Sequence, residues 1–427
     1  MSMQSLYDDF AEEFVSSDSR QSNTMADWLL IMVTTLLFAM GLISIYSATY
    51  EAGMSEYFTK QLLFGVVGAG IMLSIMFMPE RWLFDYAYIF YGLVMVLLIA
   101  VIVVGKTVYG SKSWLTIGPL TFQPSELGKI ATLLAVARSI SARGRDLSSW
   151  SDLIVPILLF VVPITLIMLE PDFGSASVYG VTLLGIMFWG GANLHLITFL
   201  VCAPISIIMG FIGREWVFLS SLFSASIPMF LKRDLMKALA MLLVFIAIGF
   251  SSRYVYGVLK PHQQSRIQTF LNPDNDPRGR GYHVIQSIMA VGSGGLTGKG
   301  FLHGTQTQLR YIPKQWTDFI FCVPTEEFGF VGGVIVIGLL AILIMQCFSI
   351  AKQSGNPFGS ILSASVGIIF FYHATVNIGM AIGAFPVMGI PLPFLSAGGS
   401  SLVMNMASVG IVLNVYRNRR KVGRVKL

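Results

Sequence analysis

Apolar runs separated by short polar stretches repeat along nearly the whole chain. Most runs are about 17 to 25 residues long, and a helix of that length crosses about 30 Å of hydrocarbon. The predicted helices cover residues 28–48, 61–78, 84–105, 124–140, 153–169, 174–189, 194–212, 216–231, 236–250, 330–350, 359–384 and 401–415. The pattern therefore predicts an all-α polytopic membrane protein with about twelve transmembrane helices.

Basic clusters at two places set the orientation of these helices. Arginines stand near the end of the fourth helix at position 138 and after it at positions 143 and 145, and the tail 417–427 has six basic residues. Basic loops stay on the cytoplasmic side of a membrane, so both clusters are predicted inside. Residues 1–27, which we expect to form a flexible acidic tail, are then cytoplasmic too, because four helices separate them from the first cluster. Residues 28–416 are predicted to form a single transmembrane domain.

Composition supports the membrane assignment and narrows the function. Hydrophobic residues make up 55% of the chain and charged residues only 12%, against about 25% charged in soluble proteins. The net charge of +6 comes from basic residues at helix ends and in one loop, so no nucleic-acid partner is predicted. The three cysteines fall in or beside apolar runs at unrelated spacings, which indicates neither a disulfide framework nor a metal site.

One long polar segment, residues 251–318, interrupts the apolar runs. It carries eight Lys or Arg against three Asp, a net charge of +5, and three of the five histidines. Counting helices places the segment outside the cell, where the positive-inside rule does not favour basic residues. If one of the two helices within 216–250 lay in the interface instead of crossing, the segment would fall inside. An anionic ligand on the outer side would explain the charge, so we expect the chemistry here.

Ionisable residues in or beside the spans are further candidates, since each costs about 2.5 to 3.5 kcal/mol at the centre of a membrane helix. Glu126 and Lys129 lie three residues apart and can pair on one helical face, either as a stabilising ion pair or as part of a site. Glu170 and Asp172 flank a proline, where a solvated turn is an equal alternative. The pair Glu326–Glu327 is expected to open a helix and to interact with its dipole.

Two aspartates in the stretch FLNPDNDPRGRGYH are candidates for a general base. Asp274 and Asp276 are followed by Pro277, which favours extended backbone at Asp276 and fits an ordinary turn equally well. The same segment supplies the basic side chains Arg266, Arg278, Arg280 and Lys299. A carboxylate among such cations suits a base that acts on a phosphate-bearing substrate. The stretch GSGGLTGKG lacks the spacing of a Walker phosphate loop.

Long ordered motifs give the chain a strong resemblance to a known family. They are QPSELGK at 123–129, EPDFGSA at 170–176, FLNPDNDPRGRGYHVIQS at 270–287, GSGGLTGKGFLHGTQTQLRYIPKQWTDFIF at 292–321, EEFG at 326–329 and PLPFLSAGGS at 391–400. With these motifs the chain resembles, over nearly its whole length, the SEDS family (shape, elongation, division and sporulation) of polytopic peptidoglycan glycosyltransferases. The sequences GTQTQL and IPKQWTDFIF resemble those of the family branch that acts in cell elongation more than those of the branch that acts in division.

The resemblance implies polymerisation of lipid II at the outer face of the bacterial cytoplasmic membrane, with release of undecaprenyl pyrophosphate. It also implies a class B penicillin-binding protein, a transpeptidase, as partner. No organic cofactor is implied; basic side chains, alone or with Mg2+ or Mn2+, would neutralise the pyrophosphate, and Asp276 is the one open candidate for a metal ligand. Because the family core has about ten spans, residues 215–250 are interpreted as an inserted helix pair.

The family pattern also assigns roles to individual residues. Its essential aspartate falls on Asp276, which narrows the candidate base from the two neighbouring aspartates to one and leaves Asp274 as an internal control. Its other functional polar positions fall on Glu126, Lys129 and Asp172. The full set of expected substrate contacts is Glu126, Lys129, Asp172, Lys60, Arg266, Arg278, Arg280 and Lys299. The chain departs from the pattern at three places: Ser113 precedes Trp114 where Arg is frequent, Glu170 replaces a usual Gln, and Lys60 replaces a common Arg.

The expected reaction is a single inverting displacement, in which Asp276 takes the proton from the acceptor's sugar hydroxyl as that oxygen attacks the anomeric carbon of the donor. A lipid II flippase is the competing prediction, because Lys129, His373 and Asn377 put polar groups inside helices. Transporters, however, are expected to have inverted repeats and polar sites near the middle of the membrane, whereas this chain concentrates its ionisable groups at the predicted outer face. A membrane scaffold for cell-wall enzymes, the third alternative, would need no particular carboxylate.

Overall fold

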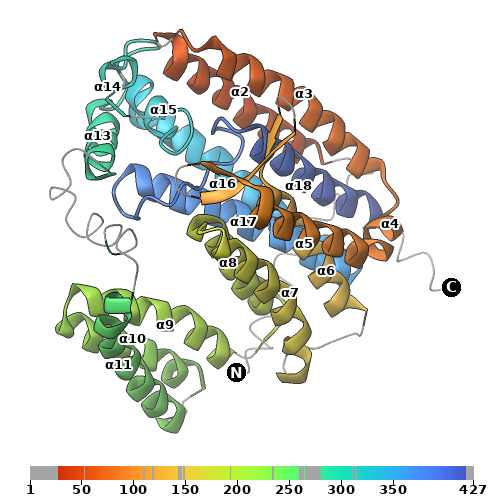
Figure 1. Cartoon of the computed structure of the whole chain (residues 1–427), viewed down its shortest axis with the longest axis vertical. Helices are drawn as coiled ribbons and strands as arrows, with labels where there is room; N and C mark the ends of the chain where they lie inside the picture. Colours follow the sequence, from red (N-terminus) through yellow and green to blue (C-terminus); the bar gives the residue numbers. More distant parts are fainter. Residues whose placement is uncertain are drawn as a thin grey trace, which may run out of the picture.

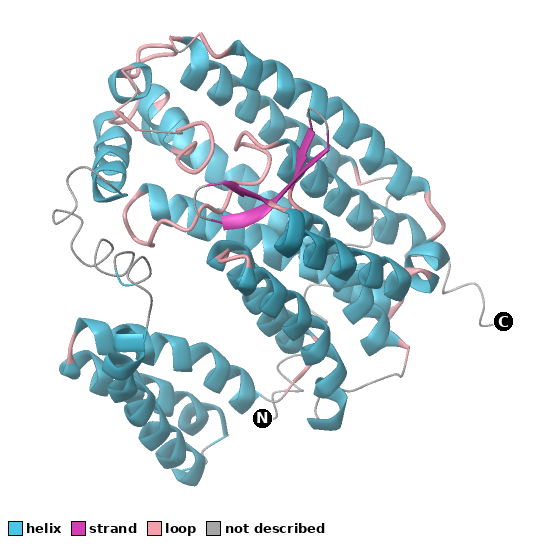
Figure 2. Cartoon of the chain, viewed as in Figure 1, coloured by secondary structure: helices cyan, strands magenta, loops and turns pink. Residues whose placement is uncertain are grey.

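The computed structural model describes residues 27–51, 53–108, 111–117, 120–142, 147, 150–192, 194–232, 235–258, 264, 280–309, 311–312 and 315–419. Helices make up most of this part of the chain, and many of them pack lengthwise against one another (Figures 1 and 2). Seven helices in these ranges are long and apolar enough to cross a membrane, and shorter apolar helices accompany them. The prediction of an all-α polytopic membrane protein is confirmed, while the number of spans stays a prediction.

The helices follow the hydrophobic pattern closely. The N-terminal half contains α2 (Trp28–Tyr50), α3 (Ser55–Phe77), α4 (Glu80–Asp85), α5 (Ala87–Val104), α6 (Pro124–Ser141), α7 (Trp150–Leu169) and α8 (Phe173–Trp189). The rest contains α9 (Leu194–Ile212), α10 (Arg214–Lys232), α11 (Leu235–Val258), α13 (Arg280–Ser293), α14 (Thr305–Gln308), α15 (Cys322–Glu327), α16 (Gly329–Gln353), α17 (Pro357–Ala381) and α18 (Gly399–Asn418). The clearest difference is that the predicted helix 84–105 is divided at Tyr86 into α4 and α5.

Helix α6 is the least apolar of the predicted spans that lie within the core. It is buried at almost every residue and packs against α5, α7, α17 and α18. Pro124 occupies its first turn, where a missing N–H costs nothing, and Glu126 follows in the same turn. The polar residues of α6 therefore face protein instead of lipid, which is where membrane proteins keep such groups.

Helices α3 and α18 make the most extensive helix pair, and a polar contact closes one end of it. Asn414 Nδ2 lies 2.8, 3.3 and 2.6 Å from the carbonyl oxygens of Ile75, Met76 and Met78. Arg417 donates to the carbonyls of the same turn. The carbonyl of Ile75 also accepts the amide of Met78 at 3.2 Å, but donors from α3 itself run out in this last turn, so α18 supplies further ones.

Helices α9, α10 and α11 form a group of their own beside the larger bundle (Figure 1). Aromatic rings fasten the three together: Phe199 of α9 stacks on Phe245 of α11 at 5.8 Å, and Phe218 of α10 meets Phe250 of α11 at 5.7 Å between ring centroids. Within this group, α10 and α11 correspond to the helix pair expected at 215–250. That the pair is an insertion stays a prediction.

Two segments that lie between the predicted helices contain regular structure. Residues 106–122 form a small antiparallel sheet of β1 (Lys106–Val108), β2 (Ser111–Ile117) and β3 (Leu120–Phe122), in that spatial order. In the segment 251–318, α11 continues to Val258 and helices α13 and α14 follow. The alternation of polar and apolar residues is too short in both segments to reveal these elements.

We expect Asn414→Leu to lower the free energy of unfolding by about 1–2 kcal/mol, because three carbonyls at the end of α3 lose a buried donor. Thermal unfolding in detergent measures the change. Asn405→Leu is the control on the same helix, since the Asn405 side chain makes no hydrogen bond within the described residues. Equal losses in the two variants would mean that the bonds to α3 contribute nothing specific.

Candidate active site

A buried charged cluster joins the start of α6 to the middle of α17. Lys129 Nζ lies 2.8 Å from Glu126 Oε1, and only 8% and 6% of these two side chains is exposed. Lys129 Nζ also lies 3.4 Å from His373 Nε2. Charges are tolerated in such surroundings only when they are paired and hydrogen-bonded. The second carboxylate oxygen of Glu126 is buried and has no hydrogen-bond partner among the described residues.

The same face of α17 holds the chain between α17 and α18. His373 Nδ1 lies 3.1 Å from the carbonyl oxygen of Pro391. One helical turn further on, Asn377 donates to the carbonyls of Ile390 at 2.8 Å and Asp318 at 2.9 Å. Two polar side chains of α17 therefore connect the PLPFLSAGGS motif to the charged cluster and to the segment before α15.

Asp172 lies beside the start of α6 and caps α8. Its carboxylate accepts hydrogen bonds from the amide of Ser175 at 3.0 Å and from its hydroxyl at 2.8 Å. Gln123, the residue before α6, donates to the same carboxylate at 2.9 Å. A Cβ atom at Gly174 would overlap the carbonyl of Met388, so a glycine is needed for this approach of the loop after α17. Two of the motifs, and the loop that leads to the PLPFLSAGGS motif, thus meet at one end of the bundle.

Glu170 is almost completely buried, with 1% of its surface exposed. Burial, and secondly the charge of Asp172, raises the pKa of Glu170 to about 8. The alternative of a solvated turn is therefore wrong for Glu170, since the turn is packed inside the protein.

A second ionic cluster lies where α13, α14 and α15 meet. Lys299 Nζ lies 2.8 Å from Glu326 Oε1, 2.7 Å from the hydroxyl of Ser293 and 2.7 Å from that of Thr305. Glu326 also accepts the amides of Gln306 at 2.8 Å and of Thr307 at 2.9 Å. All three N–H donors of Lys299 are thus engaged within the protein. A substrate contact by Lys299 stays a prediction, and it would require one of these bonds to open.

The two carboxylates of α15, Glu326 and Glu327, have pKa values that are shifted in opposite directions. Burial raises the pKa of Glu326, but the hydrogen bonds from Lys299, Thr307 and the nearby amides outweigh it, so the pKa is lowered. Burial raises the pKa of Glu327, whose Oε1 accepts hydrogen bonds from Ser47 and from the amide of Leu302. The two acids end α15 and precede α16, which begins at Gly329. The expectation that they open a helix is wrong; they hold the 299–308 loop.

The remaining predicted residues lie away from these clusters or outside the described residues. Lys60 lies 3.0 Å from Glu56 on the exposed surface of α3. Arg280 begins α13. Asp274, Asp276, Arg266 and Arg278 lie outside the described residues, so their roles stay predictions. Among the residues that the structure does describe, no three His, Cys, Asp or Glu side chains are grouped closely enough to hold a metal ion, and no step is assigned to one.

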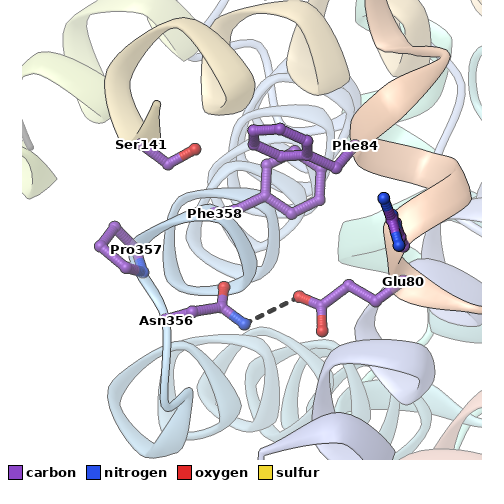
Figure 3. A pocket seen from close by; sticks show the side chains of 7 residues that line it. Glu80, Phe84, Ser141, Asn356, Pro357 and Phe358 are labelled. Atoms are coloured by element: carbon purple, nitrogen blue, oxygen red, sulfur yellow. Dashed lines mark hydrogen bonds between the residues drawn. The ribbon is translucent and has the colours of Figure 1, made fainter. Parts of the chain in front are cut away.

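A pocket of about 350 Å³ lies at the opposite end of α6. Phe84, Ser141 and Phe358 line it, and at its edge Asn356 donates to Glu80 at 2.9 Å (Figure 3). Ser141 ends α6 while Glu126 lies in its first turn, and a helix of 18 residues spans about 27 Å. In the predicted topology this pocket faces the cytoplasm, far from the charged cluster.

Comparison with known proteins connects this arrangement to a family. The model of the cell cycle proteins FtsW, RodA and SpoVE matches residues 27–233 and 221–421. The chain belongs to the FtsW/RodA/SpoVE family. A peptidoglycan glycosyltransferase of Escherichia coli, MrdB, is 34% identical over 92% of this chain and 93% of its own length. Stage V sporulation protein E of Bacillus subtilis is 33% identical over 93% and 98%.

Solved structures of the FtsW/RodA/SpoVE family share the fold. A chain from a peptidoglycan synthase complex, in which polymerisation and crosslinking are coordinated, matches with a TM-score of 0.71 and 30% identity over 93% of this chain and 99% of its own. The rod shape determining protein RodA of Thermus thermophilus matches with a TM-score of 0.62 and 26% identity over 92% and 98%. The family resemblance predicted from the motifs is confirmed.

The sequence alone gave neither His373 nor Gln123 a place among the expected substrate contacts. His373 is visible there only as a polar residue within an apolar run, and Gln123 only as part of a motif. The structure connects His373 to Lys129 and Gln123 to Asp172. The one usable signal was the spacing of four between His373 and Asn377, which puts both on one face of α17.

Glu170→Gln should flatten the pH dependence of stability. Between the ordinary pKa of 4.5 and the folded value of about 8, the unfolded chain releases a proton that the folded chain keeps, so wild-type stability falls as pH rises through this window. Glutamine has no proton to release, and the variant should unfold at a higher temperature than the wild type above about pH 8. Melting curves from about pH 5 to 9 measure this, with the exposed Glu215→Gln as control. Parallel curves for Glu170→Gln and wild type would contradict it.

Glu326→Gln should loosen the 299–308 loop, because glutamine offers one acceptor oxygen where the carboxylate offers two. We expect the amides of Gln306 and Thr307 to exchange with deuterium at least about tenfold faster. Hydrogen exchange with mass spectrometry measures the rates, and Glu56→Gln, which removes an exposed ion pair, is the control. Unchanged protection of the two amides would show that Glu326 does not hold the loop.

Proposed function

We propose that this protein is a peptidoglycan glycosyltransferase that polymerises lipid II at the outer face of the bacterial cytoplasmic membrane during cell elongation. The observation that carries the proposal is the nearly full-length similarity to relatives that bear this name. The buried cluster of Glu126, Lys129 and His373 supports it, because a membrane helix retains such charges mainly for function. Motifs typical of the elongation branch support the role in maintaining rod shape.

The proposed reaction is a single displacement at an anomeric carbon. The acceptor's sugar hydroxyl loses its proton to Asp276, and its oxygen forms the new glycosidic bond as the bond from the anomeric carbon to the pyrophosphate breaks. Undecaprenyl pyrophosphate leaves with the bonding electrons. One base suffices because the leaving group is already good. The other expected contacts, Lys129 and the arginines at 266, 278 and 280 among them, would neutralise the diphosphate charge.

The proposal includes an orientation and a partner. Both termini are cytoplasmic, as the basic cluster after α6 and the basic tail indicate. A class B penicillin-binding protein would crosslink the strands that this chain makes. In support, a structurally similar chain comes from a synthase complex that coordinates polymerisation with crosslinking. Mg2+ or Mn2+ remains the proposed aid to departure of the pyrophosphate.

Lipid II translocation is the competing function, and the burial of Lys129 and His373 inside the helix bundle favours it. A flippase must carry a polar headgroup through the bilayer, so it needs polar groups along its path. The two functions differ in product: translocation leaves lipid II intact, whereas polymerisation consumes it. Both are therefore scored in the same preparation.

Asp276→Asn should abolish the formation of glycan strands from labelled lipid II by the purified protein with its partner, because the amide cannot accept the hydroxyl proton. Gel analysis of the strands measures the product, and a vesicle assay scores translocation. Asp274→Asn is the matched control and should keep wild-type activity. Co-purification of the partner shows that Asp276→Asn is folded. Continued polymerisation by Asp276→Asn, or translocation without polymerisation in the wild type, would overturn the proposal.

A further inference from the structure

The protonation of His373 follows from its two neighbours. The carbonyl of Pro391, 3.1 Å from Nδ1, can only accept a hydrogen bond, so Nδ1 carries the proton. The other nitrogen, Nε2, then offers its lone pair. It lies 3.4 Å from Lys129 Nζ, whose ammonium can only donate. His373 is thus an acceptor for Lys129, held in place by the backbone of the PLPFLSAGGS motif.

The ammonium of Lys129 is only partly satisfied. It has three N–H donors, of which Glu126 Oε1 and His373 Nε2 accept two. Within the described residues, the third finds no acceptor. Two further buried atoms around His373 and Lys129 lack partners there: Oε2 of Glu126, and Oδ1 of Asn377 one turn along α17 from His373. Buried polar groups are normally paired, so this cluster is built to receive something else.

We propose that His373 is a positioning residue, which holds the Lys129 ammonium so that its third N–H points at an anionic oxygen of the lipid-linked sugar substrate. The inference rests on the proposed function and names a residue that acts through another one. A lysine has a flexible four-carbon stem, and with Glu126 as its only acceptor it could adopt several arrangements. Two acceptors on different helices leave it one, which is the preorganisation that catalysis by electrostatic stabilisation needs.

The alternative is that His373 only fills space between α6 and α17. The two roles predict that different substitutions of His373 will be tolerated. A space-filling residue tolerates an apolar side chain of similar size and gains nothing from polarity. An acceptor for Lys129 tolerates glutamine, which can donate to Pro391 and accept from Lys129, and it rejects leucine. Asparagine is shorter, so it keeps the bond to Pro391 and loses the reach to Lys129.

The test compares His373→Gln, His373→Asn and His373→Leu in polymerisation of lipid II by the purified protein with its partner. We expect kcat/KM to stay within about threefold of wild type for Gln and to fall about tenfold to a hundredfold for Asn and Leu, as for the loss of a bond to a charged group. Melting temperatures report folding. Ser365→Ala removes another buried hydrogen bond of α17, to the carbonyl of Ile361, and should keep wild-type activity.

The outcomes distinguish a failure of the positioning role of His373 from a failure of the proposed function. Full activity of His373→Leu, or equal losses in His373→Gln and His373→Asn, would overturn the positioning role while the wild type still polymerises lipid II. A wild type that makes no strands would overturn the proposed function, and this inference with it. If His373→Leu fails to fold, the difference between the Gln and Asn variants decides, because both keep the polar contact with Pro391.

Discussion

The buried pair of Glu126 and Lys129 is the contact on which the arrangement of the site depends. Removing two charges from water costs several kcal/mol per ion, and the cost is met only where geometry and further hydrogen bonds are good. Lys129 therefore needs His373, and His373 is held in turn by the carbonyl of Pro391. The charges of α6 are thus connected through His373 of α17 to the loop that follows α17.

The second ionic cluster uses the same chemistry for a different purpose. Both oxygens of Glu326 are engaged, and all three donors of Lys299 are taken by protein atoms. A saturated network of this kind holds a loop in one conformation. In the cluster around Lys129, one carboxylate oxygen of Glu126 has no hydrogen-bond partner among the residues that the structure describes. The two clusters have the same pair of residue types and differ in how completely the lysine and the carboxylate are hydrogen-bonded.

The motifs that the sequence separates by hundreds of residues meet because α6, α8 and α17 bring their polar ends together. Asp172 caps α8 and accepts from Gln123, while Gly174 lets the loop near Met388 approach. Opposite this end, the pocket at Phe84 and Ser141 lies across the length of α6. In the predicted topology, the length of α6 separates the charged cluster at the outer end from this pocket at the cytoplasmic end.

The sequence by itself was enough to predict most of the long helices, the family and the possible pairing of Glu126 with Lys129, because hydrophobic length, ordered motifs and a spacing of three residues can be read along the chain. The sidedness of the helices, read from the basic loops, stays a prediction. Only the tertiary structure decided that Glu170 is buried, that Glu326 and Glu327 hold a loop instead of opening a helix, and that His373 is joined to Lys129. Burial and contacts between distant segments depend on which faces pack together, and one helix's pattern of residues does not contain that information.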